Sequence, residues 1–277
     1  MQWIVNTCLR REGGYDALIY QLERQNTPYT LVRKPPMAPY LCAMHDDLDE
    51  DGHNKPIMLD HINGPVFVTG TTSMQAVSEA HGWNPGYLTA PSQQEGIEHW
   101  GDHMLNREAR WGRIDEIVAP DHAFFVRPDL DLKAFSGTVF EPSNPSAETF
   151  EEFRTRIMNI KGWTNCPPDT LVMIAPIQEI WSEYRCYVID GEVKTASRYK
   201  TGNRVAYSDE VGDMFIRYAN ERVAEWNPRP AFVMDIAHTP NGPKIIETNA
   251  ISSSGFYAID MNIFVGEMNA LCEKIAG

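Results

Sequence analysis

Two carboxylates and one amide lie near the C-terminal end of the chain, at Asp235, Glu247 and Asn249. Two apolar runs, 231–237 and 244–248, flank the peptide Thr-Pro-Asn-Gly-Pro, and this pattern predicts a β-hairpin. Glu247 and Asn249 are two residues apart, so their side chains leave the same face of a strand. Carboxylate and amide oxygens together form a ligand set that suits Mg²⁺ rather than zinc.

The length of the hairpin connection decides whether Asp235 joins that face. An odd number of loop residues puts Asp235 opposite Glu247, whereas a two-residue Asn-Gly turn puts it opposite Thr248, on the wrong face. We therefore expect a three- or five-residue connection. The alternative is a solvated strand face that is simply acidic, because acidic residues are common on exposed strands.

Positive side chains precede this hairpin in the segment FFVRPDLDLKAFSGTVF, which contains Arg127, Lys133 and the pair Ser136-Gly137 in a short strand–turn–strand pattern. A polyphosphate requires fixed positive charge and a small turn whose backbone N–H groups can be approached closely. The next segment predicts a strand, a proline-containing hinge and a strand pair that turns at an Asp-Gly dipeptide. It carries Glu179, Glu183, Arg185, Arg198 and Lys200.

In this order the segments resemble the ATP-grasp superfamily, in particular its small clade named for two arginines and a lysine, which is common in bacteria and their phages. The matching segments are FVRPDLDLKAFSG, APIQEIWSEYRCYVIDG, SRYK and MDIAHTPNGPKIIETNAISSSGFYA, and the resemblance runs from about Pro65 to the C-terminus. It implies an α/β (α+β) ATP-grasp fold, in which two α/β subdomains grip ATP and a small α/β domain precedes them. The expected boundaries are 1–95 for the first domain and 96–277 for the ATP-grasp domain, with subdomains of about 96–174 and 175–277.

The resemblance also implies roles for individual residues. Arg127 and Lys133 would contact phosphates, and the backbone of 175–178 would contact adenine. The ribose hydroxyls would be held by Glu179 or Glu183, and the resemblance does not decide between them. The phosphate-covering loop departs from the pattern of larger members, which have several glycines there. The complete nucleotide-binding set is Arg127, Lys133, Ser136, Gly137, Pro176, Ile177, Gln178, Glu179 and Glu183.

The remaining expected site residues fall into three groups. By the resemblance, Asp235, Glu247 and Asn249 would bind Mg²⁺. The groups expected to face the transferred phosphoryl group or the acceptor carboxylate are Arg185, Arg198 and Lys200. The segment that follows the metal ligands should lie beside the reacting carboxylate, with Ser252, Ser253, Ser254, Gly255 and Tyr257 as substrate contacts.

The activity implied by the resemblance is that of an ATP- and Mg²⁺-dependent, ADP-forming ligase. Such an enzyme joins a carboxylate to an amine through an acyl phosphate, because phosphorylation turns a carboxylate oxygen into a good leaving group. The substrates would be a small-molecule or peptide carboxylate and an amine. Two alternatives stay open: a kinase that uses the same cleft and stops at phosphorylation, and a nucleotide-binding protein that has lost catalysis.

Composition is compatible with a soluble enzyme. The formal charge of −14 over 277 residues argues against an extended nucleic-acid-binding surface. The five cysteines are odd in number and contain no CxxC pair, which predicts neither a zinc site nor a disulfide framework and favours a reducing cytoplasm. No stretch has the length of a signal peptide or a membrane span, so we expect no membrane association. The oligomeric state stays open, with a homodimer as one option.

Hydrophobic spacing predicts helices at 15–24, 73–81, 148–160, 213–225 and 261–275, with Ser146 as the N-cap of the third, and early strands at 2–7, 30–33 and 66–70. Two further motifs could bind metal. His99 and His103 have i, i+4 spacing but no third ligand, and a structural or substrate-facing pair is favoured. The acidic segment 45–53 resembles the start of a calcium loop, but Met58 stands where a glutamate is needed, which favours a solvated loop.

Overall fold

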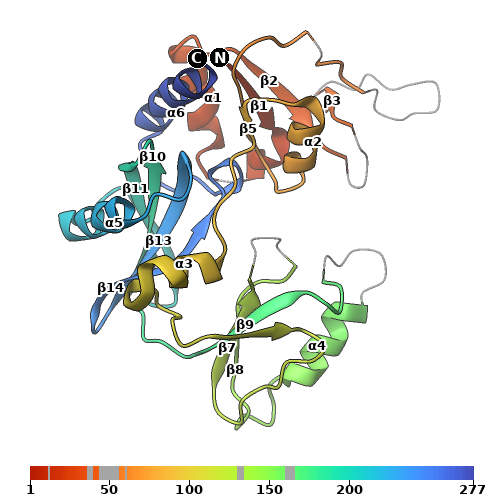
Figure 1. Ribbon diagram of the computed structural model, residues 1–277, viewed down its shortest axis with the longest axis vertical. Coiled ribbons are helices and arrows are strands. Elements are labelled where there is room, and N and C mark those ends of the chain that lie inside the picture. Colours follow the sequence, from red (N-terminus) through yellow and green to blue (C-terminus); the bar gives the residue numbers. More distant parts are fainter. Residues whose placement is uncertain (12, 36–39, 44–55, 60, 130–133, 160–165) are drawn as a thin grey trace. The chain divides into compact units, whose positions relative to one another are not determined.

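The computed structural model describes the chain except residues 12, 36–39, 44–55, 60, 130–133 and 160–165. The chain divides into two compact units. Unit 1 consists of Met1–Ala90, Ser182–Ile236 and Asn249–Gly277, and unit 2 consists of Pro91–Trp181 and Ala237–Thr248. Most helices and strands of both units are labelled in Figure 1.

Unit 1 begins with a five-stranded sheet of order β3-β2-β1-β4-β5, in which β1 runs parallel to both β2 and β4. This arrangement confirms the β–α–β opening expected from the sequence. In β1, Trp3 and Val5 belong to one hydrophobic core and Ile4 to another, so the strand is buried on both faces, as is typical of parallel strands. The elements are β1 (Gln2–Asn6), η1 (Thr7–Arg11), α1 (Tyr15–Arg24), β2 (Tyr29–Arg33), β3 (Cys42–Ala43), β4 (Val66–Thr69), α2 (Met74–His81) and β5 (Pro85–Gly86).

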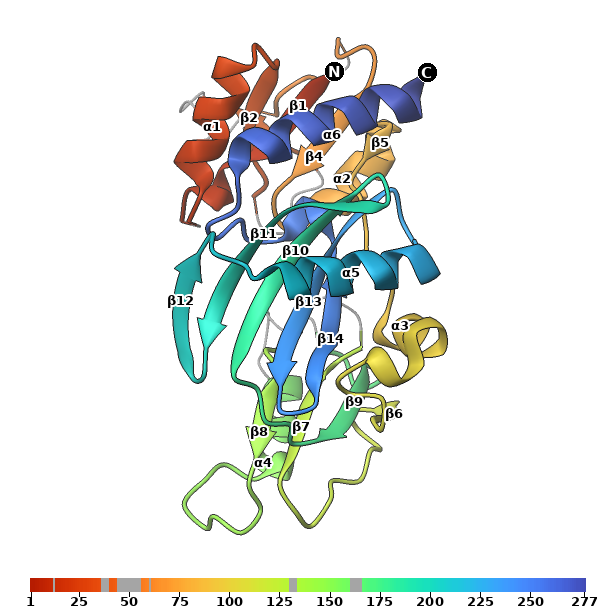
Figure 2. The same ribbon diagram turned by 90° about the vertical axis from the view of Figure 1, so that its left-hand side faces the viewer.

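A second five-stranded sheet has the order β12-β11-β10-β13-β14. The expected strand pair turns at Asp190 and Gly191, both with positive φ, which matches the two-residue turns favoured in hairpins. Helix α5 crosses one face of this sheet (Figure 2), where Phe215 stacks on Tyr184 at a centroid distance of 4.0 Å. The elements are β10 (Ser182–Ile189), β11 (Glu192–Thr201), β12 (Arg204–Ser208), α5 (Asp213–Glu225), β13 (Ala231–Thr239), β14 (Gly242–Asn249), η3 (Ile251–Ser253) and α6 (Met261–Ala276).

One hydrophobic core joins the two sheets of unit 1. It contains Trp3 from β1, Leu18 from α1, Tyr187 from β10 and Phe264 from α6, all fully buried. The rings of Trp3 and Tyr187 both meet Phe264 edge to face, at 5.9 and 5.2 Å. This core therefore includes residues from both the expected first domain and the expected last subdomain, and the boundaries given above stay a prediction.

Unit 2 is built on a four-stranded antiparallel sheet of order β6-β9-β7-β8. Its core is aromatic: Phe124 and Phe140 from the sheet pack against Phe150 and Phe153 from α4. The alternation along β7 puts Phe124 and Val126 in this core, so Phe125 and Arg127 leave the opposite face of the sheet. The elements are α3 (Gln93–Trp100), η2 (Gly101–His103), β6 (Arg110–Arg113), β7 (Phe124–Pro128), β8 (Thr138–Phe140), α4 (Phe150–Asn159) and β9 (Leu171–Pro176).

The helices confirm the spacing argument, with one corrected cap. Helices α1 and α5 have the expected bounds, and α2, α4 and α6 differ from expectation by one or two residues at an end. The expected N-cap Ser146 was wrong, because Thr149 and Glu152 form a capping box: Glu152 N donates to Thr149 Oγ1 at 3.2 Å, and Thr149 N donates to the Glu152 carboxylate at 2.9 Å.

The two possible metal motifs outside the hairpin do not gain support. Helix α3 ends at Trp100, and Gly101 has a left-handed φ of 49°, so His103 lies in η2 and the pair is not on one helical face. Trp100 and Met104, next to these histidines in the sequence, are buried. The acidic segment 45–53 lies outside the described residues.

In the described ranges no helix is both long and apolar enough to span a bilayer. All five cysteines are free thiols, with Cys8 exposed and the other four buried.

Candidate functional site

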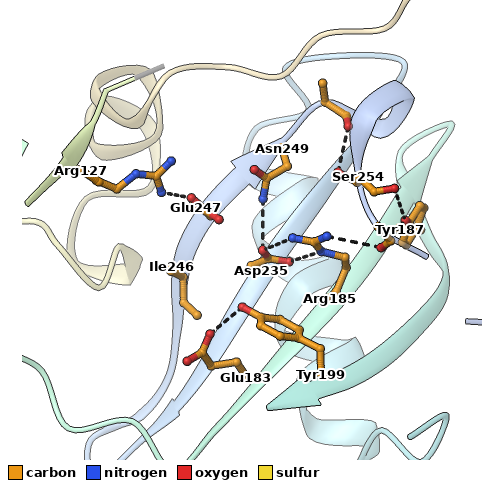
Figure 3. A network of polar contacts seen from close by, with 12 residues as sticks. Arg127, Glu183, Arg185, Tyr187, Tyr199, Asp235, Ile246, Glu247, Asn249 and Ser254 are labelled. Carbon is orange, nitrogen blue, oxygen red and sulfur yellow. Dashed lines mark hydrogen bonds and ion pairs between the residues drawn. The ribbon is translucent and has the colours of Figure 1, made fainter. Parts of the chain in front are cut away.

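Asp235 is the centre of a buried polar cluster in unit 1 (Figure 3). Its side chain is 1% exposed, and it accepts two hydrogen bonds from Arg185, Nε to Oδ1 at 2.9 Å and Nη2 to Oδ2 at 2.8 Å. Asn249 donates from Nδ2 to Oδ2 at 3.1 Å. Burial acts to lower the pKa of Arg185, but its attraction to and hydrogen bonds with Asp235 outweigh that and hold the pKa well above its usual value. Arg185 therefore stays a cation beside Asp235.

The hairpin turn explains how Asn249 reaches Asp235. The turn residues are Pro240 and Asn241, and Gly242 follows with a left-handed φ of 91°. This pattern is that of a type I turn followed by a G1 bulge, in which the glycine acts as a third loop residue. Counted from such a turn, Asn249 lies on the face of Asp235 and is its diagonal neighbour, which agrees with the 3.1 Å contact. The strand bounds leave a connection of two residues, Pro240 and Asn241, rather than the expected three or five; Asn249 still reaches Asp235.

A second ion pair lies on the same strand as Arg185. Glu183 is opposite Lys200 in the β10–β11 register, and Lys200 Nζ donates to Glu183 Oε1 at 2.6 Å. Tyr199 Oη donates to the other carboxylate oxygen at 2.7 Å. Because Glu183 and Arg185 are two residues apart in β10, both side chains leave the same face of the sheet.

Arg198 does not join Arg185 and Lys200. It is opposite Tyr184 in the register, on the face that packs against α5. Its Nε is buried and has no hydrogen-bond partner among the described residues. The structure therefore brings two of the three expected catalytic cations together and separates the third. A register shift in the β10–β11 pairing leaves Tyr199 as an extra residue, so Arg198 lies on the face opposite to Lys200 although the two are two residues apart.

The three serines expected to contact substrate are buried, and their hydroxyls bond within the chain. Leu88 N donates to Ser252 Oγ at 2.9 Å, Tyr87 Oη donates to Ser253 Oγ at 2.8 Å, and Ser254 Oγ donates to the carbonyl of Ala250 at 2.8 Å. These hydrogen bonds hold the Ser252–Ser254 segment in place within unit 1. They leave Gly255 and Tyr257 as the members of the expected set that adjoin Arg185: the Gly255 carbonyl accepts from Nη1 at 3.3 Å, and the Tyr257 ring lies beneath the guanidinium.

In unit 2, Arg127 forms an ion pair with Glu247 (Figure 3). Their side chains are 13% and 20% exposed, so the pair is largely removed from water. The residue expected to bind phosphate and a residue expected to bind Mg²⁺ are thus paired with each other. The sequence offered no signal for this contact, because the two residues are far apart in the chain.

Asp129 is a buried carboxylate that sequence reasoning missed. It is 6% exposed, and the Trp111 indole Nε1 donates to it at 2.8 Å. Burial raises its pKa, while the Trp111 hydrogen bond and the charge of Arg127 act in the opposite direction. The sequence signal that could have identified Asp129 was its position directly after the Arg127-Pro128 dipeptide.

The other expected nucleotide contacts lie in exposed segments of unit 2. Ser136 and Gly137 are exposed, and a Cβ at Gly137 would lie 2.5 Å from the Phe125 ring, so this position admits only glycine without movement of the ring. Lys133 lies outside the described residues. Pro176 ends β9, and the exposed residues that follow include Glu179, which accepts from Trp181 Nε1 at 2.9 Å. The exposed hinge residues are Ile177, Gln178 and Glu179.

A cavity of about 340 Å³ lies in unit 2, lined by Phe124, Ile174 and Pro176 among others. These residues alternate with Phe125 and Ala175 along β7 and β9. Ala175 lines the cavity as well, so the cavity is not confined to the core side of the sheet.

The donor atoms fit a hard divalent cation. Among the described residues no three His, Cys, Asp or Glu side chains gather into a metal-binding cluster, but the expected set contains two carboxylates and an amide. The Asn249 amide donates from its nitrogen to Asp235, and its oxygen is an acceptor group. The set offers only oxygen donors, which is the preference of Mg²⁺.

Solved structures share this fold. A D-alanine-D-alanine ligase from Coxiella burnetii has a TM-score of 0.58 and 14% identity, over 100% of this chain and 95% of that chain. A RimK domain ATP-grasp protein from Sphaerobacter thermophilus has a TM-score of 0.55 and 15% identity, over 100% and 98%. The ATP-grasp ligase PsnB, solved with precursor peptide PsnA2 and AMPPNP, has a TM-score of 0.54 and 16% identity, over 98% and 97%. At these identities the likeness concerns the fold alone.

Comparison with curated protein sequences gave no match. The model of an ATP-grasp domain family, the third family of the clade named for two arginines and a lysine, matches residues 58–268. That range includes the Arg185–Asp235–Asn249 cluster and the Arg127–Glu247 pair, and it covers most of the chain. With the mixed α/β architecture described above, the match shows that this protein belongs to the two-arginine, one-lysine clade of the ATP-grasp family.

Proposed function

We propose that the protein is an ATP- and Mg²⁺-dependent ligase that joins a carboxylate to an amine and releases ADP and phosphate. The observation that carries this proposal is the buried cluster of Asp235, Arg185 and Asn249, in which a fixed cation adjoins a set of oxygen donors. Membership of the ATP-grasp family and the fold shared with two kinds of ligase support it.

Each part of the nucleotide would have its own contacts. Arg127 suits the phosphates, since a guanidinium gives two parallel hydrogen bonds to an anion. For the ribose we favour Glu183 over Glu179. Lys200 and Tyr199 fix the orientation of the Glu183 carboxylate and still leave lone pairs on both oxygens, whereas Glu179 is exposed beyond the end of a strand. Asp235, Glu247 and Asn249 would hold Mg²⁺, which neutralises phosphate charge when bound.

The chemistry has two steps. A carboxylate oxygen of the acceptor attacks the γ-phosphorus of ATP, and the bond to the ADP oxygen breaks to give an acyl phosphate. The amine nitrogen then attacks the acyl carbon, phosphate leaves with its bonding electron pair, and the nitrogen releases a proton. Arg185 on β10 and Lys200 on β11 lie on one face of the sheet, and both would stabilise the negative charge that develops on the transferred group.

The test is ADP formation from ATP and Mg²⁺ with a panel of carboxylates, measured with and without an amine. A ligase gives amide product and ADP in equal amounts, and both depend on the amine. ADP formation that continues without amine, together with a stable phosphorylated product, would replace the ligase proposal with a kinase.

A further inference from the structure

The sheet face that carries the polar cluster changes character toward β12, where it becomes aromatic. Three tyrosines, here called the aromatic edge, stack on one another: Tyr199, Tyr207 and Tyr257. The Tyr199 and Tyr257 rings lie 5.1 Å apart at 24°, and the Tyr207 and Tyr257 rings lie 4.9 Å apart at 23°. Distances of this size with nearly parallel planes are those of offset stacking.

The aromatic edge is joined directly to the polar cluster. The Arg185 guanidinium carbon lies 4.7 Å from the centroid of Tyr257 and 5.5 Å from that of Tyr199, within cation–π range. The Tyr199 hydroxyl donates to Glu183. Burial, followed by the charges of Asp235 and Glu183, raises the pKa of Tyr199 well above its usual value, so this hydroxyl stays a donor.

Tyr257 is held in a strained backbone conformation. Its φ of 52° is in the left-handed region, which bulky residues seldom adopt. Such a conformation is strained and persists only where the surroundings of the residue hold it. Here Arg185, Tyr199 and Tyr207 hold the ring, and Gly255 two residues earlier is tied to Arg185 and Tyr187. In this backbone conformation the Tyr257 ring lies against the Arg185 guanidinium.

The outer end of the aromatic edge is open to solvent. Tyr207 is 54% exposed and Val205 is 70% exposed, and both lie on β12, an edge strand of the sheet. Val205 lies opposite Lys200, so Val205 and Tyr207 share the face that carries Lys200 and Glu183. The exposed apolar side chains of Val205 and Tyr207 are therefore connected to the buried Arg185 through Tyr257. Exposure of such an apolar surface to water is unfavourable.

We propose that the acceptor of this ligase carries an aromatic or branched apolar side chain next to its reacting carboxylate, and that Tyr207 and Val205 determine this specificity. The inference rests on the proposed function. A carboxylate drawn to Arg185 at the polar end would leave the adjoining side chain over the Tyr257 and Tyr207 rings. A glycine- or alanine-like acceptor leaves those rings exposed and gains nothing from them.

The test uses two matched carboxylates, N-acetylphenylalanine and N-acetylalanine, with ATP, Mg²⁺ and hydroxylamine as a general amine nucleophile. The carboxylate takes the γ-phosphoryl group of ATP with release of ADP, and hydroxylamine nitrogen then displaces phosphate and loses a proton to give a hydroxamate. We expect kcat/KM to favour the phenylalanine compound by about tenfold, from ring stacking and apolar burial. Tyr207→Ala should reduce that preference to about twofold, mainly through KM, and Tyr207→Phe should retain it.

Tyr20→Ala is the matched control, because Tyr20 is 61% exposed on α1 of the same unit and should leave the preference unchanged. Equal kcat/KM for the two carboxylates, a preference that survives Tyr207→Ala, or no hydroxamate from N-acetylphenylalanine would each overturn the inference. Calorimetry of Mg·ATP binding separates the two levels of failure. If Mg·ATP binds, the acceptor inference alone has failed; if it does not, the proposed function has failed as well.

Discussion

The pairing of Arg127 with Glu247 predicts an unusual behaviour for a metal-ligand variant: Glu247→Gln should bind ATP more tightly than wild type when Mg²⁺ is absent. In wild type, metal-free ATP can use Arg127 only by displacing the Glu247 carboxylate and leaving it close to the phosphates. Both side chains are mostly buried, at 13% and 20% exposure, so the pair does not count as a weak surface pair.

A hydrogen bond to a charged group contributes about 1.5–3 kcal/mol. Glutamine can still accept one hydrogen bond from Arg127, so we expect a gain at the lower end of this range, about 1.5 kcal/mol, or slightly more than tenfold in Kd. With Mg²⁺ the order should reverse, because the variant has lost a ligand. The same substitution should stop Mg²⁺-dependent turnover without unfolding the protein.

The assay is calorimetric titration of ATP in EDTA and again in excess Mg²⁺. Glu148→Gln is the control, because Glu148 makes a two-point ion pair with Arg156 in the same unit and its loss should not affect ATP. An unchanged or weaker metal-free affinity for Glu247→Gln would refute the reasoning that the two groups mask each other.

The remaining predictions concern five other positions. Glu183→Gln should weaken ATP binding and abolish discrimination against 2′,3′-dideoxy-ATP, while Glu179→Gln should do neither; the opposite result in competition binding would move the ribose contact to Glu179. Burial raises the folded-state pKa of Asp129, so the free energy of unfolding of wild type should fall as pH rises above the usual aspartate range. In urea denaturation between pH 4 and pH 7, the stability of Asp129→Asn relative to wild type should therefore increase with pH. A pH-independent difference between the two would contradict this. Ser252→Ala leaves the Leu88 N–H without its acceptor and should cost about 1–3 kcal/mol in the same assay, with ATP affinity unchanged. Lys133→Ala should weaken ATP binding by about 1.5–3 kcal/mol, and an unchanged Kd would move the phosphate site elsewhere.

Local sequence patterns predicted many of the helices and strands correctly. Periodicity placed α1 and α5, because each has one buried face at helical spacing. The hairpin pattern placed Asp235 and Asn249 on one face, and their contact agrees. Thr149 was overlooked as a cap because Ser146 is also a good N-cap residue, and only the reciprocal contact with Glu152 distinguishes them.

Long-range pairing was not accessible from the sequence. Which cation faces Asp235 depends on strand order and register, and a one-residue change of face separates Arg198 from Arg185. Similarly, the serines after Asn249 suggested polar contacts for a ligand, but their hydroxyls bond to the Tyr87–Leu88 segment and to Ala250. Hydroxyl groups bind ligands and buried backbone equally well, so residue type alone does not separate the two roles.

The most direct test of the proposed Mg²⁺-dependent nucleotide site is calorimetric titration of ATP into wild type and Asn249→Ala, each in EDTA and in Mg²⁺. This substitution removes the amide oxygen and keeps the Arg185–Asp235 pair intact. We predict that Mg²⁺ tightens ATP binding by wild type and has little effect on Asn249→Ala, while the affinities in EDTA stay similar. Failure of wild type to bind ATP in either condition, or a full Mg²⁺ effect in Asn249→Ala, would contradict the proposal.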